Sequence, residues 1–201
     1  MRSVNKIFIT TILLFAFLSA YGQHYRYLVS VLSKEKIPDG LAIIYGNFIQ
    51  RLGFSSGGFT QDIRIYHVEA KEILTFEVKP IFKMAKKNAF CYKIKPGTYI
   101  ILNYHWVQGK WYGAKFFVEP IYKGLDNSFE MTGNGKQQEI LHNDLSQFAF
   151  TVTANTLNYL GTWHFETGLV SFTDDKDEMD IMMNEKYQNL DFSKALTVLP
   201  N

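Results

Sequence analysis

The 201-residue sequence has one cysteine, Cys91, and only five prolines. A single cysteine excludes an internal disulfide framework, a multi-cysteine zinc site and an iron–sulfur cluster. The five prolines and 14 glycines exclude a collagen-like or proline-rich stalk. Beyond residue 18, no apolar run approaches the ~20 residues that a membrane-spanning helix needs. With 47% hydrophobic and 20% charged residues, the chain is instead predicted to build a folded core.

The first 22 residues have the pattern of a secretory signal peptide. Arg2 and Lys6 give a positive start, residues 7–18 are mostly apolar, and small residues lead up to Gly22. We predict a signal peptide over residues 1–22, a single domain over residues 23–201, and a periplasmic or secreted protein. An uncleaved N-terminal anchor is the alternative. Because no cysteine lies near the cleavage site, a lipid-anchored lipoprotein is not expected.

The charge balance argues against nucleic acid as a partner. The chain has 21 basic and 19 acidic residues, and removing the two basic residues of the signal peptide leaves 19 of each. Nucleic-acid binding is driven mainly by neutralisation of phosphates, which requires a basic surface. A neutral exported domain is therefore predicted not to bind nucleic acid.

Most of the remaining chain alternates between short apolar segments and turn residues. Pro38-Asp39-Gly40 is one such turn, because proline presets the turn and glycine accepts a positive φ. Residues 73–78 alternate apolar and polar side chains, which is typical of a half-buried strand. We predict a mainly β fold, an antiparallel β-sandwich of roughly nine to eleven strands. A closed β-barrel is the alternative.

The pattern becomes helical over residues 175–187. Met179, Met182, Met183 and Tyr187 recur at helical spacing, and acidic residues at the start complement the helix dipole. We predict an amphipathic helix whose methionines form a packing face. We expect this helix to cover the outer face of the aromatic hairpin described next.

A hairpin over residues 99–118 is the best-defined pair of strands. A two-residue turn at Gln108-Gly109 is predicted to join them. Both faces of this pair then carry large apolar groups, so it should be covered on both sides. The predicted register places Trp106 opposite Trp111, Tyr104 opposite Gly113, and Leu102 opposite Lys115.

The same hairpin carries the candidate binding residues. Tyr104, Trp106, Trp111 and Lys115 would form a flat surface suited to a sugar ring, a peptide or another apolar partner. Aromatic cross-strand pairs also stabilise sheets without binding anything. The sequence leaves both interpretations open, a ligand platform or packing beneath a cover.

No pattern indicates catalysis. The five histidines show no spacing that would place two zinc ligands on one helix face. Cys91 lies in an apolar strand-like run with no neighbour that would lower its pKa, so we predict a buried core residue. The acidic run at residues 174–180 lacks the glycine and glutamate of a calcium-binding loop and is predicted to begin the helix. We therefore predict no catalytic residue, no metal ligand and no cofactor.

The mature chain resembles small bacterial envelope proteins of unknown function. The resemblance implies a prealbumin-like or immunoglobulin-like sandwich and no catalytic residues, and many of those proteins are lipoproteins. It rests on three segments: Pro38-Asp39-Gly40 with Ile43-Ile44-Tyr45, Lys95-Pro96-Gly97-Thr98-Tyr99, and Asn158-Tyr159-Leu160-Gly161-Thr162.

Three functions follow as hypotheses. The first is a non-catalytic binding or structural module of the bacterial envelope, whose partner is an envelope protein, a glycan or an apolar ligand. The second is a carrier that holds an apolar ligand in a β-barrel cavity, as the 16% share of aromatic residues would allow. The third is a periplasmic hydrolase whose residues come from distant strands.

Overall fold

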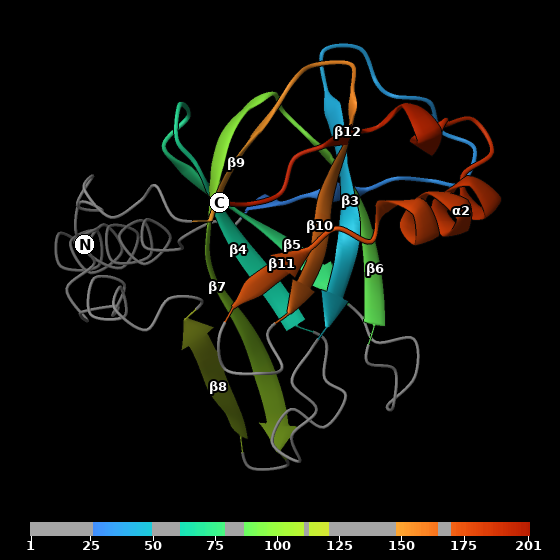
Figure 1. The fold of residues 1–201 in the computed structure, drawn as a ribbon. Coiled ribbons are helices and arrows are strands. Elements are labelled where there is room, and N and C mark those ends of the chain that lie inside the picture. The colour runs from blue at the N-terminus through green and yellow to red at the C-terminus, as the bar shows by residue number, and fades with distance from the viewer. Residues whose placement is uncertain (1–25, 50–60, 79–86, 111–112, 121–147, 165–169) are drawn as a thin grey trace, which may run out of the picture.

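The computed structural model describes residues 26–49, 61–78, 87–110, 113–120, 148–164 and 170–201 (Figure 1). The predicted signal peptide, residues 1–22, and Trp111 lie outside the described residues. Within the described part, no helix has the length and apolar character needed to cross a membrane.

The first sheet has six strands. Its order is β1-β5-β4-β7-β8, and β9 also pairs with β7. Among its described pairs, only β1 and β5 run parallel. Its strands are β1 (Arg26–Tyr27), β4 (Gln61–His67), β5 (Glu72–Val78), β7 (Gly97–Lys110), β8 (Gly113–Pro120) and β9 (Ala149–Val152).

The second sheet also has six strands. Its order is β11-β10-β3-β6-β2, and β12 also pairs with β10. At its centre β3 and β10 run parallel, with Ile43 opposite Leu157. Its strands are β2 (Val29–Ser30), β3 (Ala42–Ile49), β6 (Lys87–Ile94), β10 (Leu157–His164), β11 (Ser171–Thr173) and β12 (Leu196–Thr197).

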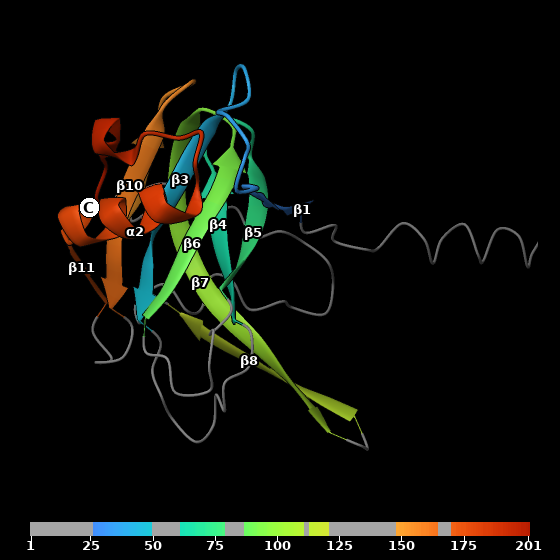
Figure 2. The same ribbon diagram turned by 90° about the vertical axis from the view of Figure 1, so that its right-hand side faces the viewer.

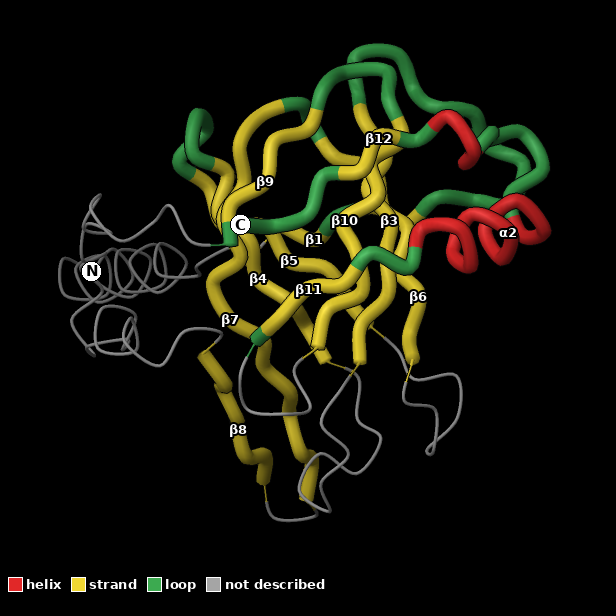
Figure 3. The backbone as a smooth tube through the Cα atoms, in the orientation of Figure 1, coloured by secondary structure: helices red, strands yellow, loops and turns green. Residues whose placement is uncertain are grey.

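The prediction of a mainly β fold is confirmed, and Figure 3 shows strands, joined by loops, as the main element of the described chain. The closed-barrel alternative is wrong for the described strands, since each sheet is an open path with two end strands. The prediction of an antiparallel fold holds only in part. A hairpin forces neighbouring strands to be antiparallel, but β3 and β10 are far apart in the sequence and are free to pair in parallel.

A core of apolar side chains lies between the two sheets. Ile63 and Phe76 of the first sheet and Ile44 and Trp163 of the second belong to one buried cluster. Aromatic rings fill much of it, and the Trp163 ring lies 5.2 Å from that of Phe90 and 6.0 Å from that of Phe76. Much of the aromatic content is therefore used in packing between the sheets.

A second core lies on the outer face of the second sheet. Helix α2 (Lys176–Lys186) packs there and buries Met179 and Met183 against Ile43 and Tyr45 of β3 (Figure 2). The predicted helix over residues 175–187 is thus confirmed with nearly the same bounds. Its predicted position over the aromatic hairpin is wrong, because its apolar face meets the apolar outer face of β3 and β10.

Two glycines allow β3 and β10 to pair. The register between these strands shifts between Tyr159 and Thr162, which marks a bulge on β10 at Gly161, with φ of +87°. A Cβ at Gly46 of β3 would lie 2.6 Å from the Gly161 backbone oxygen and 2.8 Å from the Phe90 ring. Both strands therefore need glycine at this crossing.

The two ends of the described chain connect the sheets. At one edge, Leu28 donates its N–H to the Thr75 carbonyl of the first sheet at 2.8 Å, while Val31 donates to the Cys91 carbonyl of the second at 3.2 Å. The segment after the short 3-10 helix η3 (Phe192–Lys194) also joins the two sheets. The Val198 N–H donates to the Tyr159 carbonyl of the second sheet at 2.8 Å, and the Asn201 N–H donates to the Ala149 carbonyl of the first at 3.2 Å. These connections hold the sheets together.

Candidate functional site

Of the four predicted binding residues, the structure describes the side chain of Tyr104 alone. Tyr104 is 4% exposed, belongs to the core between the sheets, and has its ring 6.0 Å from that of Phe48. It therefore packs inside the molecule. Trp106 and Lys115 are placed by their backbone in β7 and β8, and Trp111 lies outside the described residues.

The register of the hairpin differs from the prediction. Trp106 lies opposite Phe117, Tyr104 opposite Glu119, and Lys115 opposite Gln108. The connection falls at residues 111–112 because pairing continues through Lys110 and Gly113 instead of turning at Gln108-Gly109. A glycine in a strand is compatible with an uninterrupted ladder, so the dipeptide alone was a weak turn signal.

The outer half of this strand pair extends beyond the other described strands. Strand β4 pairs with β7 only as far as Asp62 opposite His105. Past that point β7 pairs, among the described strands, with β8 alone. Figure 2 shows this two-stranded ribbon extending beyond the other strands. We call residues 105–110 with 113–118 the β7–β8 ribbon.

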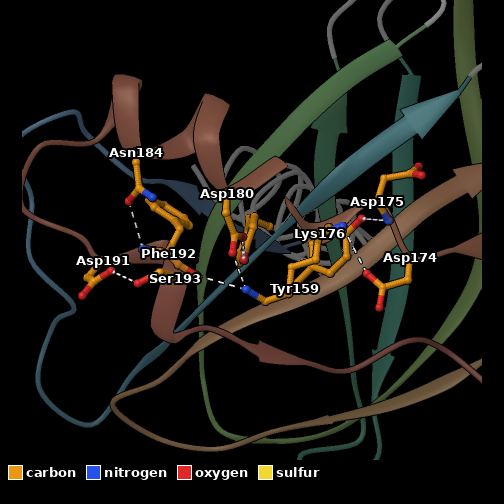
Figure 4. Close-up of polar contacts among 10 residues, drawn as sticks. Tyr159, Asp174, Asp175, Lys176, Asp180, Asn184, Asp191, Phe192 and Ser193 are labelled. Atoms are coloured by element: carbon orange, nitrogen blue, oxygen red, sulfur yellow. Dashed lines mark hydrogen bonds and ion pairs between the residues drawn. The ribbon is translucent and has the colours of Figure 1, made fainter. Parts of the chain in front are cut away.

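A buried polar cluster lies under helix α2 (Figure 4). The Tyr45 hydroxyl donates to Asp180 Oδ1 at 2.5 Å, and Lys176 Nζ forms an ion pair with Asp180 Oδ2. Lys176 also donates to the Phe192 carbonyl at 3.2 Å. Burial and the hydrogen bond to Asp180 raise the pKa of Tyr45, which keeps its hydroxyl protonated. The cluster therefore attaches the helix to β3 and to η3.

The start of the helix is attached to the same sheet. The Asp175 N–H donates to the Tyr159 hydroxyl of β10 at 2.9 Å, and the Lys176 N–H donates to Asp174 Oδ1 at 3.1 Å. Both bonds satisfy N–H groups that the first turn of a helix leaves without partners. The acidic run thus begins the helix, as predicted.

Cys91 is a buried thiol on β6, as predicted. It is 5% exposed and belongs to the core beneath the helix. Burial raises its pKa to about 12, although the nearby Tyr187 hydroxyl acts in the opposite direction. Because the thiolate is the reactive form, this environment makes Cys91 a poor nucleophile.

His67 is a buried histidine whose neighbours the sequence did not reveal. Its ring stacks on Tyr99 with centroids 4.5 Å apart, and Nε2 lies 3.3 Å from Glu69 Oε2. Glu69 in turn accepts the Thr98 N–H at 3.0 Å, a hydrogen bond that lowers the pKa of its carboxyl. Gly97 is necessary here, because a side chain would run into the His67 ring. No local spacing connects residues 67 and 97.

A groove of about 440 Å³ lies beside β12 and η3. Aliphatic side chains and polar side chains both line it, and they come from three separate parts of the chain. The lining residues are Lys36, Ile37, Asn155, Thr156, Leu157, Asn189, Leu190, Asp191, Lys194 and Leu196. In the described part of the chain, no group of three or more histidine, cysteine or acidic residues could hold a metal ion.

Comparison with known proteins yields one distant likeness. No family model and no curated protein matches the sequence. Among solved structures, the chain is similar to a leucine-rich repeat protein from Bacteroides thetaiotaomicron VPI-5482, with a TM-score of 0.33 and 12% identity. The match covers 64% of this chain and 14% of that one. A likeness this low carries no argument about fold or function.

Proposed function

We propose that this chain is an exported, non-catalytic binding module of the bacterial envelope, and that the β7–β8 ribbon is its binding element. The partner is an envelope protein or a glycan, contacted through Trp106, Trp111 and Lys115. We further propose that the two sheets form a sandwich of the immunoglobulin-like or prealbumin-like kind. The signal-peptide pattern of residues 1–22 supports export.

The observation that carries this proposal is the length of the ribbon beyond the other described strands. The core between the sheets includes Tyr104, and the pairing of β4 with β7 ends at His105. An isolated two-stranded ribbon is at best marginally stable in water. A ribbon that pairs with no other described strand, yet carries tryptophan, is well suited to gain its stability from a partner.

The roles of the buried ionisable groups support a non-catalytic function. Tyr45 and Asp180 attach helix α2, and the raised pKa of Cys91 disfavours its thiolate. We do not retain the carrier hypothesis, because it required a barrel cavity, whereas aromatic rings occupy the space between two open sheets.

The test compares two double variants, W106A/W111A and W106F/W111F, in co-sedimentation with purified cell envelopes of the producing bacterium. The alanine variant should bind at least tenfold more weakly, since aromatic anchors commonly contribute ~2 kcal/mol or more to an interface. The phenylalanine variant keeps the rings and should retain most of the binding. Mass spectrometry of the exported protein should show an N-terminus at Gln23.

Trp163 supplies the folding control. It is fully buried and becomes the sole tryptophan in both variants, so its fluorescence reports the core alone. The proposal requires the alanine variant to unfold cooperatively and near the wild-type temperature. The proposal would be refuted if the alanine variant co-sedimented with the envelopes as well as the wild type does. Loss of its cooperative unfolding would show that the tryptophans serve packing instead.

A further inference from the structure

The groove beside β12 lies far from the β7–β8 ribbon, since β12 and β8 are at opposite ends of the view in Figure 1. Its volume of about 440 Å³ falls within the ~300–1,000 Å³ that is usual for small binding sites. Ten described residues line it. Its chemistry can therefore be derived side chain by side chain.

Hydrogen bonds between distant segments hold the walls of the groove in place. Asn189 Nδ2 donates to the Lys34 carbonyl at 2.6 Å, and the Gln188 N–H donates to the Ser33 carbonyl at 3.0 Å. On the other wall, the Asn155 N–H donates to the Leu41 carbonyl at 2.7 Å. The groove is thus formed before any ligand arrives, which lowers the entropy cost of binding.

The floor of the groove is aliphatic. Leu157 and Leu190 are 6% and 8% exposed, whereas Leu196 is 48% exposed. Ile37 packs against the same buried cluster from the side. A ligand that covers Leu196 would remove apolar surface from water, at about 25 cal/mol per Å².

Among the described residues, the rim of the groove carries one uncompensated positive charge. Lys194 Nζ lies 2.8 Å from Asp191 Oδ2, so these two charges offset each other. No ion-pair partner of Lys36 is found among the described residues. The ligand that complements this rim therefore carries a single negative charge next to an aliphatic group.

Two side-chain amides favour a peptide over a hydrocarbon chain. Asn155 uses its Oδ1 to accept the Gly40 N–H, and no described group accepts from its Nδ2. Asn189 uses its Nδ2 on Lys34, and no described group donates to its Oδ1. A peptide group can satisfy one donor and one acceptor, whereas an alkyl chain would remove both from water without compensation.

We propose that this groove binds the C-terminal end of a partner protein whose last residues are aliphatic, with the terminal carboxylate at Lys36 and the side chains on the leucine floor. The probes are acetyl-Leu-Leu with a free carboxylate, the same peptide as its C-terminal amide, and octanoate. NMR titration should show shifts at Leu157 and Leu196. The carboxylate peptide should bind about fivefold tighter than the amide, as expected for a solvent-accessible ion pair.

Lys36→Met should abolish the difference between the two peptides. Lys34→Met is the matched control, because its exposed side chain does not line the groove and only its carbonyl holds Asn189. The proposal would be overturned if the wild type bound neither peptide, bound the two peptides equally, or bound octanoate as tightly as the carboxylate peptide. It would also be overturned if Lys36→Met still discriminated between the two peptides, or if Lys34→Met no longer did. The experiment does not involve the ribbon, so its result is independent of the proposed envelope binding.

Discussion

Replacing Tyr45 with phenylalanine tests whether Asp180 attaches helix α2 to the second sheet. The change removes the hydroxyl that donates to Asp180 at 2.5 Å and keeps the ring, whose centroid lies 5.3 Å from that of Tyr159 and 4.8 Å from that of Phe192. A hydrogen bond to a charged group contributes ~1.5–3 kcal/mol. Because Asp180 keeps its ion pair with Lys176 and is not fully buried, we expect a loss of about 2 kcal/mol.

Urea unfolding, followed by the fluorescence of the buried Trp163, measures this loss directly. The urea concentration at the midpoint of unfolding should fall, while the slope of the unfolding free energy against urea concentration should stay the same. To make Trp163 the only emitter, the measurement is made in the W106F/W111F background. For a domain of this size, the same loss should lower the melting temperature by about 4–8 °C. Adding Asp180→Asn completes a double-mutant cycle that isolates the coupling between the two side chains.

Tyr66→Phe is the matched control. Tyr66 is a partly exposed tyrosine of β4 whose hydroxyl has no hydrogen-bond partner among the described residues. Its replacement should change the free energy of unfolding by less than about 0.5 kcal/mol. If Tyr45→Phe costs no more than this control, the hydroxyl does not hold the helix and our reading of the buried cluster is wrong.

Two further predictions concern the second sheet. Gly46→Ala should destabilise the protein by about 3 kcal/mol, because the new Cβ would meet a backbone oxygen that cannot move aside. Gly40→Ala is the control and should cost about 1–2 kcal/mol, because at φ +74° its Cβ is strained but meets open space. Equal losses of unfolding free energy in urea would contradict this reasoning. Burial raises the pKa of both Cys91 and Tyr92 to about 12, from ordinary values of 9.0 and 10.0, so each favours the protonated form in the folded state. Their contribution to stability is therefore complete below about pH 9 and is lost as the pH rises toward 12, and Cys91→Ala should flatten the fall in unfolding free energy between about pH 9 and 11. An unchanged slope would refute the role of the thiol.

Local sequence patterns predicted where the strands and the helix lie more accurately than they predicted which elements pack against one another. The alternation at residues 73–78 and the spacing of the methionines depend only on which side chains face one direction. Phe76, Met179 and Met183 are buried as predicted, but Thr75 of the predicted polar face is also buried and Met182 of the predicted packing face is 42% exposed. The helix was placed over the wrong surface because an amphipathic face specifies that it needs an apolar partner without specifying which one.

The candidate sites show the same division. Cys91 was predicted to be buried from its apolar neighbours, and it is buried. Tyr104 was predicted to join a surface platform, yet it lies in the core, because the second sheet packs on the face of β7 that carries it, with Phe48 of β3 against its ring. The packing of His67 against Tyr99 and the groove beside β12 had no local signal, since each needs segments that are far apart in the chain.

By itself, the sequence determined the strand-rich composition of the chain, the position and apolar face of its helix, and the burial of its lone cysteine. These properties follow from side chains a few residues apart, whose relative direction is set by the period of a strand or helix. Only the tertiary structure decided that β3 and β10 run parallel, that Asp180 meets Tyr45 across 135 positions, and that Lys36 borders a leucine floor. Those contacts join distant segments whose positions are set by the packing of the whole fold, and no local periodicity encodes them.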